Sequence, residues 1–136
     1  MRFVSNHVSA EFRKLVESNG VSVSDWVALR RIFDDGTSSA PSLMADLGMT
    51  KGAVSKILAR LEERGLIQRA PAETDRRAQR VSLTRAGKTL VPRLSALADR
   101  NDERFFGHLS DQEREMLSRV LREMVRMNNW KDVPVE

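Results

Sequence analysis

The chain has 136 residues, of which 40% are hydrophobic and 31% are charged. These values are ordinary for one globular domain and exclude a disordered or collagen-like protein. It contains no cysteine and only two histidines, His7 and His108, so disulfides, thiolate metal sites and cysteine-based redox sensing are excluded and we expect neither a metal nor a cofactor. No apolar stretch approaches the roughly 18 residues of a membrane-spanning helix, and the first residues lack the apolar segment of a signal peptide, so we expect a cytoplasmic protein.

Two amphipathic helices are predicted before residue 37. In the first helix, apolar side chains recur every three or four residues, as one buried stripe requires, and Gly20 ends the helix. The second helix is expected to begin at about Ser24, a favourable N-cap, and to end at Gly36. The apolar stripe of the first helix consists of Val4, Val8, Phe12, Leu15 and Val16.

A helix-turn-helix is predicted next. Ser39 can cap a short helix that stops at Gly48, and after one further residue Thr50 can cap a fourth helix that Gly65 closes. Two helices joined by so short a turn are typical of this motif. The apolar face of the fourth helix, expected to point inward, consists of Val54, Ile57, Leu58 and Leu61.

The pattern changes to a β-hairpin after residue 65. Apolar and polar residues alternate over residues 80–83, and residues 66–69 can form the partner strand. The polar connection, residues 71–78, is expected to protrude as a loop. Two more helices follow, one opened by Thr84 and one that begins with the capping box at residues 110–113. The expected fold is therefore mainly α, with a small β-hairpin wing.

The positive charge is concentrated in one segment. Residues 66–88 contain six basic and two acidic residues, and the basic and acidic residues elsewhere cancel, so this segment carries the whole net charge of +4. Clustered basic charge is typical of a surface that binds nucleic acid. A solvated, arginine-rich loop would show the same pattern.

The fourth predicted helix has an outward face suited to DNA. Cations and small side chains lie opposite its apolar stripe, and such a surface fits a major groove about 12 Å wide. Gly52 lies in the first turn, where its missing side chain would allow close approach to a phosphate. The alternative reason for this glycine is packing against the preceding helix. The outward face consists of Lys51, Ser55, Lys56, Ala59 and Arg60.

Three segments resemble the multiple antibiotic resistance regulator (MarR) family: residues 43–55, 61–67 and 75–84. The most specific part is Asp75-Arg76-Arg77 followed by Val81-Ser82-Leu83-Thr84, at the right distance behind the predicted recognition helix. The flanking helices also match the family's dimerisation elements in order and length, so the resemblance covers nearly the whole chain. It implies a sequence-specific transcription regulator, expected to be a repressor, that binds a pseudo-palindromic operator as a homodimer.

The resemblance also implies a division of the chain. Residues 1–20 would form an N-terminal dimerisation helix, and residues 89–136 the C-terminal dimerisation helices and tail. Residues 21–88 would form the winged helix-turn-helix, with the recognition helix at about 50–64 and the wing at about 66–84.

The family's DNA-contacting residues can be placed on this sequence. The arginine matching Arg77 enters the minor groove from the wing tip, and the aspartate matching Asp75 helps to hold the wing's shape. A narrow minor groove concentrates negative potential, which favours an arginine there; the alternative is an exposed ion pair without function. Phosphate contacts are expected from Lys51, Ser55, Lys56, Arg76 and Arg80, and less firmly from Arg60. The expected DNA-binding set is Thr50, Lys51, Gly52, Ser55, Lys56, Arg60, Asp75, Arg76, Arg77 and Arg80.

A homodimer is expected because the first, fifth and sixth helices carry wider apolar stripes than a small winged domain needs. The dimer would place two recognition helices roughly 34 Å apart, one turn of DNA. An intramolecular core is the alternative use of these stripes. The candidate interface residues are Leu15, Leu117, Val120, Leu121 and Met124.

A ligand site is implied by the resemblance, because family members often bind small aromatic or anionic effectors between the dimerisation helices and the DNA-binding lobe. Phe12 and Trp26 are candidates to line such a pocket, and Arg30 or His7 to supply charge. The alternatives are a core role for the tryptophan and a solvated position for the histidine.

The rival functions fit the sequence less well. The chain contains no Gly-x-Ser-x-Gly elbow, no His-Glu-x-x-His motif and no phosphate-cradling glycine loop, so we do not expect an enzyme. A non-specific architectural DNA-binding protein is the main alternative, because the basic wing alone would suffice for it. A winged helix that binds another protein is opposed by the outward lysines.

Overall fold

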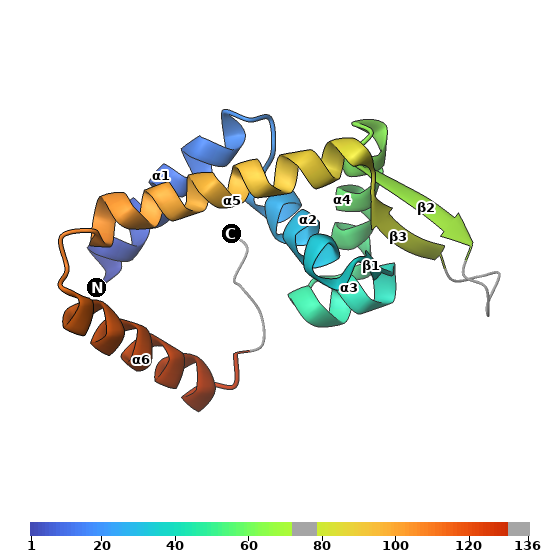
Figure 1. The fold of residues 1–136 in the computed structure, drawn as a ribbon. Coiled ribbons are helices and arrows are strands. Elements are labelled where there is room, and N and C mark those ends of the chain that lie inside the picture. Colours follow the sequence, from blue (N-terminus) through green and yellow to red (C-terminus); the bar gives the residue numbers. More distant parts are fainter. Residues whose placement is uncertain (72–78, 131–136) are drawn as a thin grey trace.

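The computed structural model describes residues 1–71 and 79–130. Figure 1 shows a long helix, α5, that runs from the winged lobe at one end of the molecule to α6 at the other, with α1 beside it. The winged lobe consists of α2, α3, α4 and the strands β1, β2 and β3. The helices are α1 (Arg2–Glu17), α2 (Val23–Asp35), α3 (Ala40–Leu47), α4 (Lys51–Glu63), α5 (Arg85–Phe106) and α6 (Asp111–Met127), and the strands are β1 (Thr37–Ser38), β2 (Ile67–Pro71) and β3 (Gln79–Leu83). None of the described helices is long and apolar enough to cross a membrane.

The hydrophobic core lies in the winged lobe and extends onto α1 and α5. Leu29 and Ile32 of α2 are completely buried, as are Val91 and Leu94 of α5. The predicted apolar face of α4 is confirmed, because Val54, Ile57, Leu58 and Leu61 are all buried. The first half of α5 is therefore part of the lobe's core, and it fixes the long helix to the lobe.

The helix starts follow the predicted caps with one exception. Ser39, Thr50, Thr84 and Ser110 each accept a hydrogen bond from the backbone N–H three residues on. The cap of α2 is Ser22, so the prediction of Ser24 is wrong.

The exception has a physical reason, which is a reciprocal capping box. Ser22 Oγ accepts from the backbone N–H of Asp25 (3.0 Å), and Asp25 Oδ2 accepts from the backbone N–H of Ser22 (3.4 Å). Two otherwise unpaired backbone donors are satisfied when the helix starts here. Ser24 lies two residues further on, in the first turn of α2, where its hydroxyl contacts that of Ser22 (2.9 Å).

The wing is a three-stranded antiparallel sheet with the order β1-β3-β2. The predicted hairpin is confirmed, with Ile67 opposite Leu83 and Pro71 opposite Gln79. Strand β1 was not predicted, because two residues are too few to show an alternating pattern.

The base of the wing is fixed to α5 by Thr84 and Gly87. Thr84 Oγ1 donates to the carbonyl oxygen of Gly65 (2.6 Å). Gly87 has no room for a larger side chain, because a Cβ atom would overlap with the carbonyl oxygen of Leu66. The hairpin therefore leaves the body at a direction set by the start of α5.

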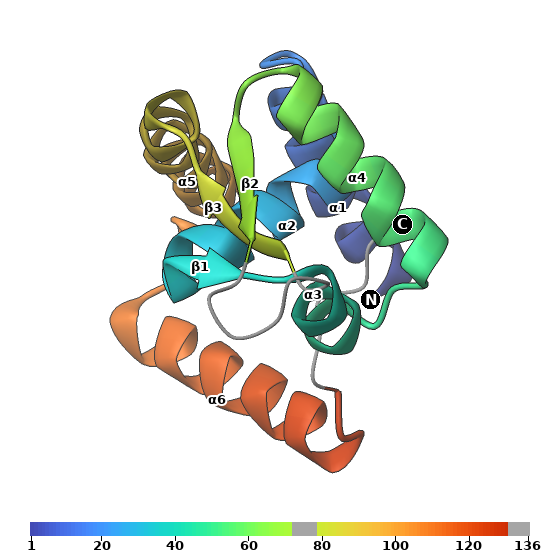
Figure 2. The same cartoon turned by 90° about the vertical axis from the view of Figure 1, so that its right-hand side faces the viewer.

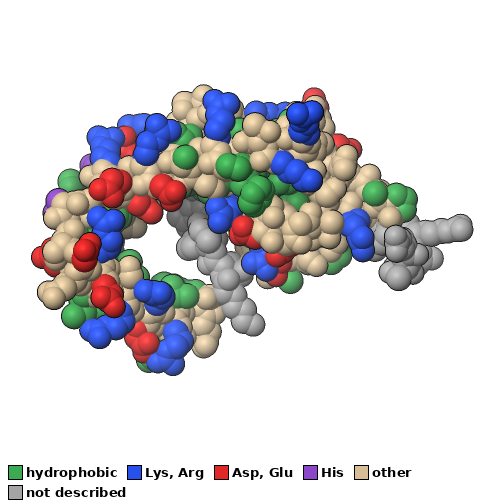
Figure 3. All heavy atoms as spheres, viewed as in Figure 1, with side chains coloured by type: hydrophobic (Ala, Val, Ile, Leu, Met, Phe, Trp, Pro, Cys, Tyr) green, Lys and Arg blue, Asp and Glu red, His purple; other side chains and the backbone are tan. Residues whose placement is uncertain are grey.

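Helix α6 differs from the others because none of its residues is buried. Figure 3 shows it standing away from the lobe, with hydrophobic side chains among charged ones on its surface. Val120 and Leu121 are 47% and 49% exposed, and Leu117 and Met124 are half-buried. An intramolecular core thus does not account for the apolar side of this helix.

Candidate nucleic-acid interface

Helix α4 presents the predicted outward face. Its start is fixed by Thr50, whose Oγ1 accepts from the backbone N–H of Ala53 (3.2 Å). Lys51, Gly52, Ser55 and Lys56 are all exposed, and beyond the helix's own backbone no heavy atom of the described residues lies within 4 Å of where a Cβ on Gly52 would be. Packing therefore does not explain this glycine in the free chain. Within the described residues, neither lysine has an ion-pair partner.

The wing lies next to α4 at the same end of the lobe. Figure 2 views this end directly, with α3, α4 and the hairpin together. Arg80 is exposed on β3 opposite Ala70. The expected wing-tip residues Asp75, Arg76 and Arg77 lie outside the described residues. At the base of the hairpin, an ion pair between Arg69 and Glu62 (3.0 Å) joins β2 to α4.

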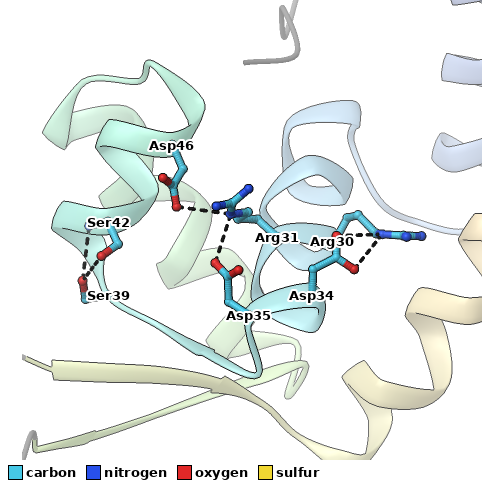
Figure 4. Close-up of polar contacts among 7 residues, drawn as sticks. All are labelled: Arg30, Arg31, Asp34, Asp35, Ser39, Ser42 and Asp46. Carbon is cyan, nitrogen blue, oxygen red and sulfur yellow. Dashed lines mark hydrogen bonds and ion pairs between the residues drawn. The ribbon is translucent and has the colours of Figure 1, made fainter. Parts of the chain in front are cut away.

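Ion pairs also fix α3 relative to α2. Figure 4 shows Arg31 of α2 between two carboxylates, Asp35 of its own helix (3.0 Å) and Asp46 of α3 (3.2 Å). The negative charges of Asp35 and then Asp46 raise the pKa of the Arg31 guanidinium, so it stays charged at every physiological pH. The spacing of Arg31 and Asp35 is visible in the sequence as an i, i+4 pair, but the contact with Asp46 is not.

Arg60 has a protein partner that sequence reasoning missed. Its Nη2 lies 2.6 Å from Oδ1 of Asp25, whose side chain is only 5% exposed, whereas the Arg60 side chain is 48% exposed. One turn further along α4, Arg64 donates a hydrogen bond to the carbonyl oxygen of Gly20. The second half of α4 is therefore bound to the connection between α1 and α2 and to the first turn of α2, and the lysines of its first half have no ion-pair partner among the described residues.

The four candidate ligand residues fall into separate surroundings. Phe12 and Trp26 meet edge to face, with ring centroids 6.4 Å apart, and the tryptophan belongs to the core. Arg30 pairs with Asp34 (3.1 Å) and donates to Ser95 Oγ of α5 (2.7 Å). His7 is exposed, and its ring lies against Phe3 (centroids 4.2 Å apart). The structure thus brings Phe12 and Trp26 together, and it gives Arg30 and His7 other partners.

A groove of about 640 Å³ lies elsewhere, between the end of α1, the end of α4 and the first turns of α5. Arginines Arg64, Arg85 and Arg93 line it together with Leu66 and Leu90. None of the four candidate ligand residues contributes to this groove.

Comparisons with known proteins agree with this architecture. The model of the MarR family matches residues 21–78. Over 100 residues the chain is 31% identical to the transcriptional regulator HosA of Escherichia coli O111:H-, with 74% of each chain covered.

Two solved structures share the fold. One is a mutant of MarR from E. coli in complex with operator DNA, with 19% identity, a TM-score of 0.78 and coverage of 91% of this chain and 89% of that one. The other is Bordetella bronchiseptica BpsR, described as regulated in its DNA binding by 6-hydroxynicotinic acid, with 25% identity, a TM-score of 0.76 and coverage of 90% and 93%. The chain belongs to the MarR family of winged-helix, DNA-binding transcription regulators, which are not enzymes.

Proposed function

We propose that the protein is a transcription repressor that binds a pseudo-palindromic operator as a homodimer. The observation that carries this proposal is the outward face of α4, where Lys51 and Lys56 are exposed and lack an ion-pair partner among the described residues. By contrast, three other cations of the lobe, Arg31, Arg60 and Arg69, each pair with a carboxylate. Unpaired cations can bind the phosphates of DNA, and the small side chains between them allow the helix to enter the major groove.

Each element has a part in the proposed complex. Lys51, Ser55 and Lys56 bind phosphates and set the register of α4 in the major groove. Thr50 and Gly52, at the start of the helix, lie close to the DNA backbone. On the wing, Arg76 and Arg80 bind phosphates, Arg77 enters the minor groove, and Asp75 orients it. A protein of the same fold has been solved with operator DNA, which supports DNA binding by this fold.

The proposed dimer is formed by α1, α5 and α6. Leu15, Leu117, Val120, Leu121 and Met124 are exposed or half-buried in the single chain, and a partner would cover them. A two-fold axis would place the two α4 helices about one turn of DNA apart, so the operator would contain two inverted half-sites with centres about 10 base pairs apart.

An effector that releases the repressor is part of the proposal. The regulation of BpsR by an aromatic acid supports an aromatic anion as its chemical class. Phe12 and Trp26 meet where α1 and α2 pack, and Arg30 reaches α5 nearby through Ser95. A shift of either contact on binding would move α1 or α5 relative to the lobe.

Selection of bound DNA tests the proposed function. Random genomic fragments are incubated with the purified full chain, and the retained fragments are sequenced. The proposal expects one recurrent inverted repeat with half-sites about 10 base pairs apart. Enrichment without any shared sequence would contradict it and would support the architectural DNA-binding alternative.

Replacing Gly52 with alanine separates stability from DNA binding. The added methyl group meets none of the described residues outside its own helix backbone, and alanine favours helix by up to about 1 kcal/mol over glycine. We therefore expect a higher melting temperature together with an operator affinity reduced about tenfold or more, because the methyl group keeps the helix start away from the phosphate. Calorimetry and a mobility-shift titration measure the two effects. Equal or tighter DNA binding would show that no phosphate approaches this glycine.

Replacing Arg77 with alanine tests the minor-groove contact. Each dimer loses two buried arginine contacts, and charge-assisted hydrogen bonds contribute about 1.5–3 kcal/mol each, so operator affinity should fall by at least about 100-fold. Dimerisation, measured by light scattering, should be unchanged. An unchanged affinity in the titration would remove Arg77 from the interface.

A further inference from the structure

We propose that Asp25, acting through Arg60, is a positioning residue that sets the angle at which α4 meets DNA. In this proposal Arg60 binds Asp25 of its own chain and does not contact a phosphate. This inference rests on the proposed DNA-binding function, because it concerns how the reading helix is held.

Asp25 is placed to hold Arg60 firmly. It is buried (3% exposed) at the first turn of α2, and both of its carboxylate oxygens are used. Oδ2 accepts from the backbone N–H of Ser22, and Oδ1 accepts from Arg60 Nη2 at 2.6 Å. The capping box fixes the carboxylate, so the guanidinium binds to a rigid point. A buried carboxylate that loses its cation is costly, which favours the paired state.

A second contact holds the same part of α4. Arg64 donates to the carbonyl oxygen of Gly20, in the turn between α1 and α2. Gly20 has a φ of 75°, and a Cβ there would lie 3.0 Å from Arg64 Nη2, so the turn leaves little space for a larger residue. Two successive turns of α4 are thus bound to residues 20–25.

A small tilt of α4 at the Arg60 end displaces its DNA-facing start by more than a hydrogen bond tolerates. Lys51 and Arg60 are nine residues apart on the helix, or about 13 Å at 1.5 Å per residue. A tilt of roughly 5° about the Arg60 end would therefore move Lys51 by about 1 Å. Functional contacts need placement to about 0.5 Å. A small change at Asp25 is enough to spoil the contacts of α4 with its specific site.

The alternative is that Arg60 leaves Asp25 and binds a phosphate in the complex. The two cases predict opposite changes in DNA affinity for Asp25→Asn. If Arg60 is a phosphate contact, the substitution releases it and tightens DNA binding. If Arg60 positions the helix, the substitution weakens specific binding, because α4 loses its fixed angle.

The experiment measures affinity for the selected operator and for a random duplex over a range of salt concentrations. It uses the full-length wild type, Asp25→Asn, Arg60→Gln and the double variant. We expect each single variant to lose about 5- to 30-fold in operator affinity, a range that corresponds to a contact of one to two kcal/mol. The double variant should be no weaker than the weaker single variant, because both remove one interaction. Affinity for random DNA and the salt slope of that non-specific binding should stay at the wild-type values, because non-specific binding does not need a fixed angle of α4 and Arg60 contributes no phosphate contact.

Two further variants keep the test independent of folding. Asp34→Asn removes an exposed carboxylate from the same helix, whose one ion-pair partner among the described residues is Arg30, and it should bind DNA like the wild type. Arg60→Lys keeps the charge and should restore part of the affinity lost in Arg60→Gln. If Asp25→Asn does not fold, the two Arg60 variants still decide, because a phosphate contact would lower the salt slope of Arg60→Gln by about 2 per dimer.

The outcomes separate this inference from the function on which it rests. Tighter binding by Asp25→Asn, additive losses in the double variant, or a lower salt slope for Arg60→Gln would overturn the positioning role. If the wild type prefers the operator and all variants bind the operator as tightly as the wild type, the positioning role is also overturned, but the proposed function stays intact. A wild type that shows no preference for any duplex would overturn both.

Discussion

Replacing Leu121 with glutamate is expected to separate the dimer and to lower operator affinity by more than about 100-fold. Leu121 is 49% exposed on α6, a helix without any buried residue. In the proposed dimer this side chain is covered by a partner, and a two-fold axis makes each substitution count twice. An unpaired carboxylate in an apolar interface costs several kcal/mol per site.

The loss of DNA affinity follows from the loss of the dimer. A monomer contacts one half-site only, and the second half-site no longer adds its contacts to the same complex. Sedimentation gives the oligomeric state, and a titration with the selected operator gives the affinity. Leu121→Met is the matched control, because it keeps an apolar side chain of similar size and should remain dimeric. A Leu121→Glu protein that stays dimeric would place the interface elsewhere.

Removing both lysines from the face of α4 is expected to lower operator affinity by about 100- to 1000-fold. In Lys51→Ala/Lys56→Ala, a dimer loses four proposed phosphate contacts, and each solvent-exposed contact contributes up to about 1 kcal/mol. The logarithm of affinity should also depend less on the logarithm of salt concentration, with the slope reduced by about 3 to 4. The fold should be unaffected, because both side chains are exposed and have no ion-pair partner among the described residues.

The control for this variant is Lys14→Ala. Lys14 is an exposed lysine of α1 that pairs with Glu11 (2.9 Å), and such a solvent-screened pair contributes little to stability. Its removal should change operator affinity by less than about twofold. A double variant of α4 with the same salt slope as the wild type would show that DNA is bound by another surface.

Local patterns predicted most of the fold. The apolar faces and the caps at Ser39, Thr50, Thr84 and Ser110 depend on residues close in sequence, and so does the pairing of β2 with β3. The start of α2 was misplaced by two residues, because two serines compete there and the acidic partner of the capping box decides between them.

The contacts that orient the reading helix could not be predicted in this way. Arg60 and Asp25 are 35 residues apart, and Arg64 and Gly20 are 44 apart. Nothing in the sequence distinguishes a paired arginine on an outward face from an unpaired one. Arg60 was therefore grouped with Lys51 and Lys56, from which the structure separates it by its buried partner.

In the proposed dimer, the organisation beyond the lobe also depends on contacts with a second copy of the chain. The division into residues 1–20, 21–88 and 89–136 remains a prediction. The buried Val16, Val91 and Leu94 join α1 and α5 to the core of the lobe, so the first boundary separates regions that pack together. The apolar side of α6 and the half-buried Leu15 belong to the interface of the proposed dimer.

The most direct test of DNA reading by α4 and the wing is a competition titration of the wild-type protein at fixed salt. The selected inverted repeat competes with a duplex of the same length and composition in scrambled order. If α4 reads bases in the major groove, the repeat should be bound at least about 10³-fold more tightly than the scrambled duplex. Equal affinity for the two duplexes would contradict sequence-specific recognition by this face.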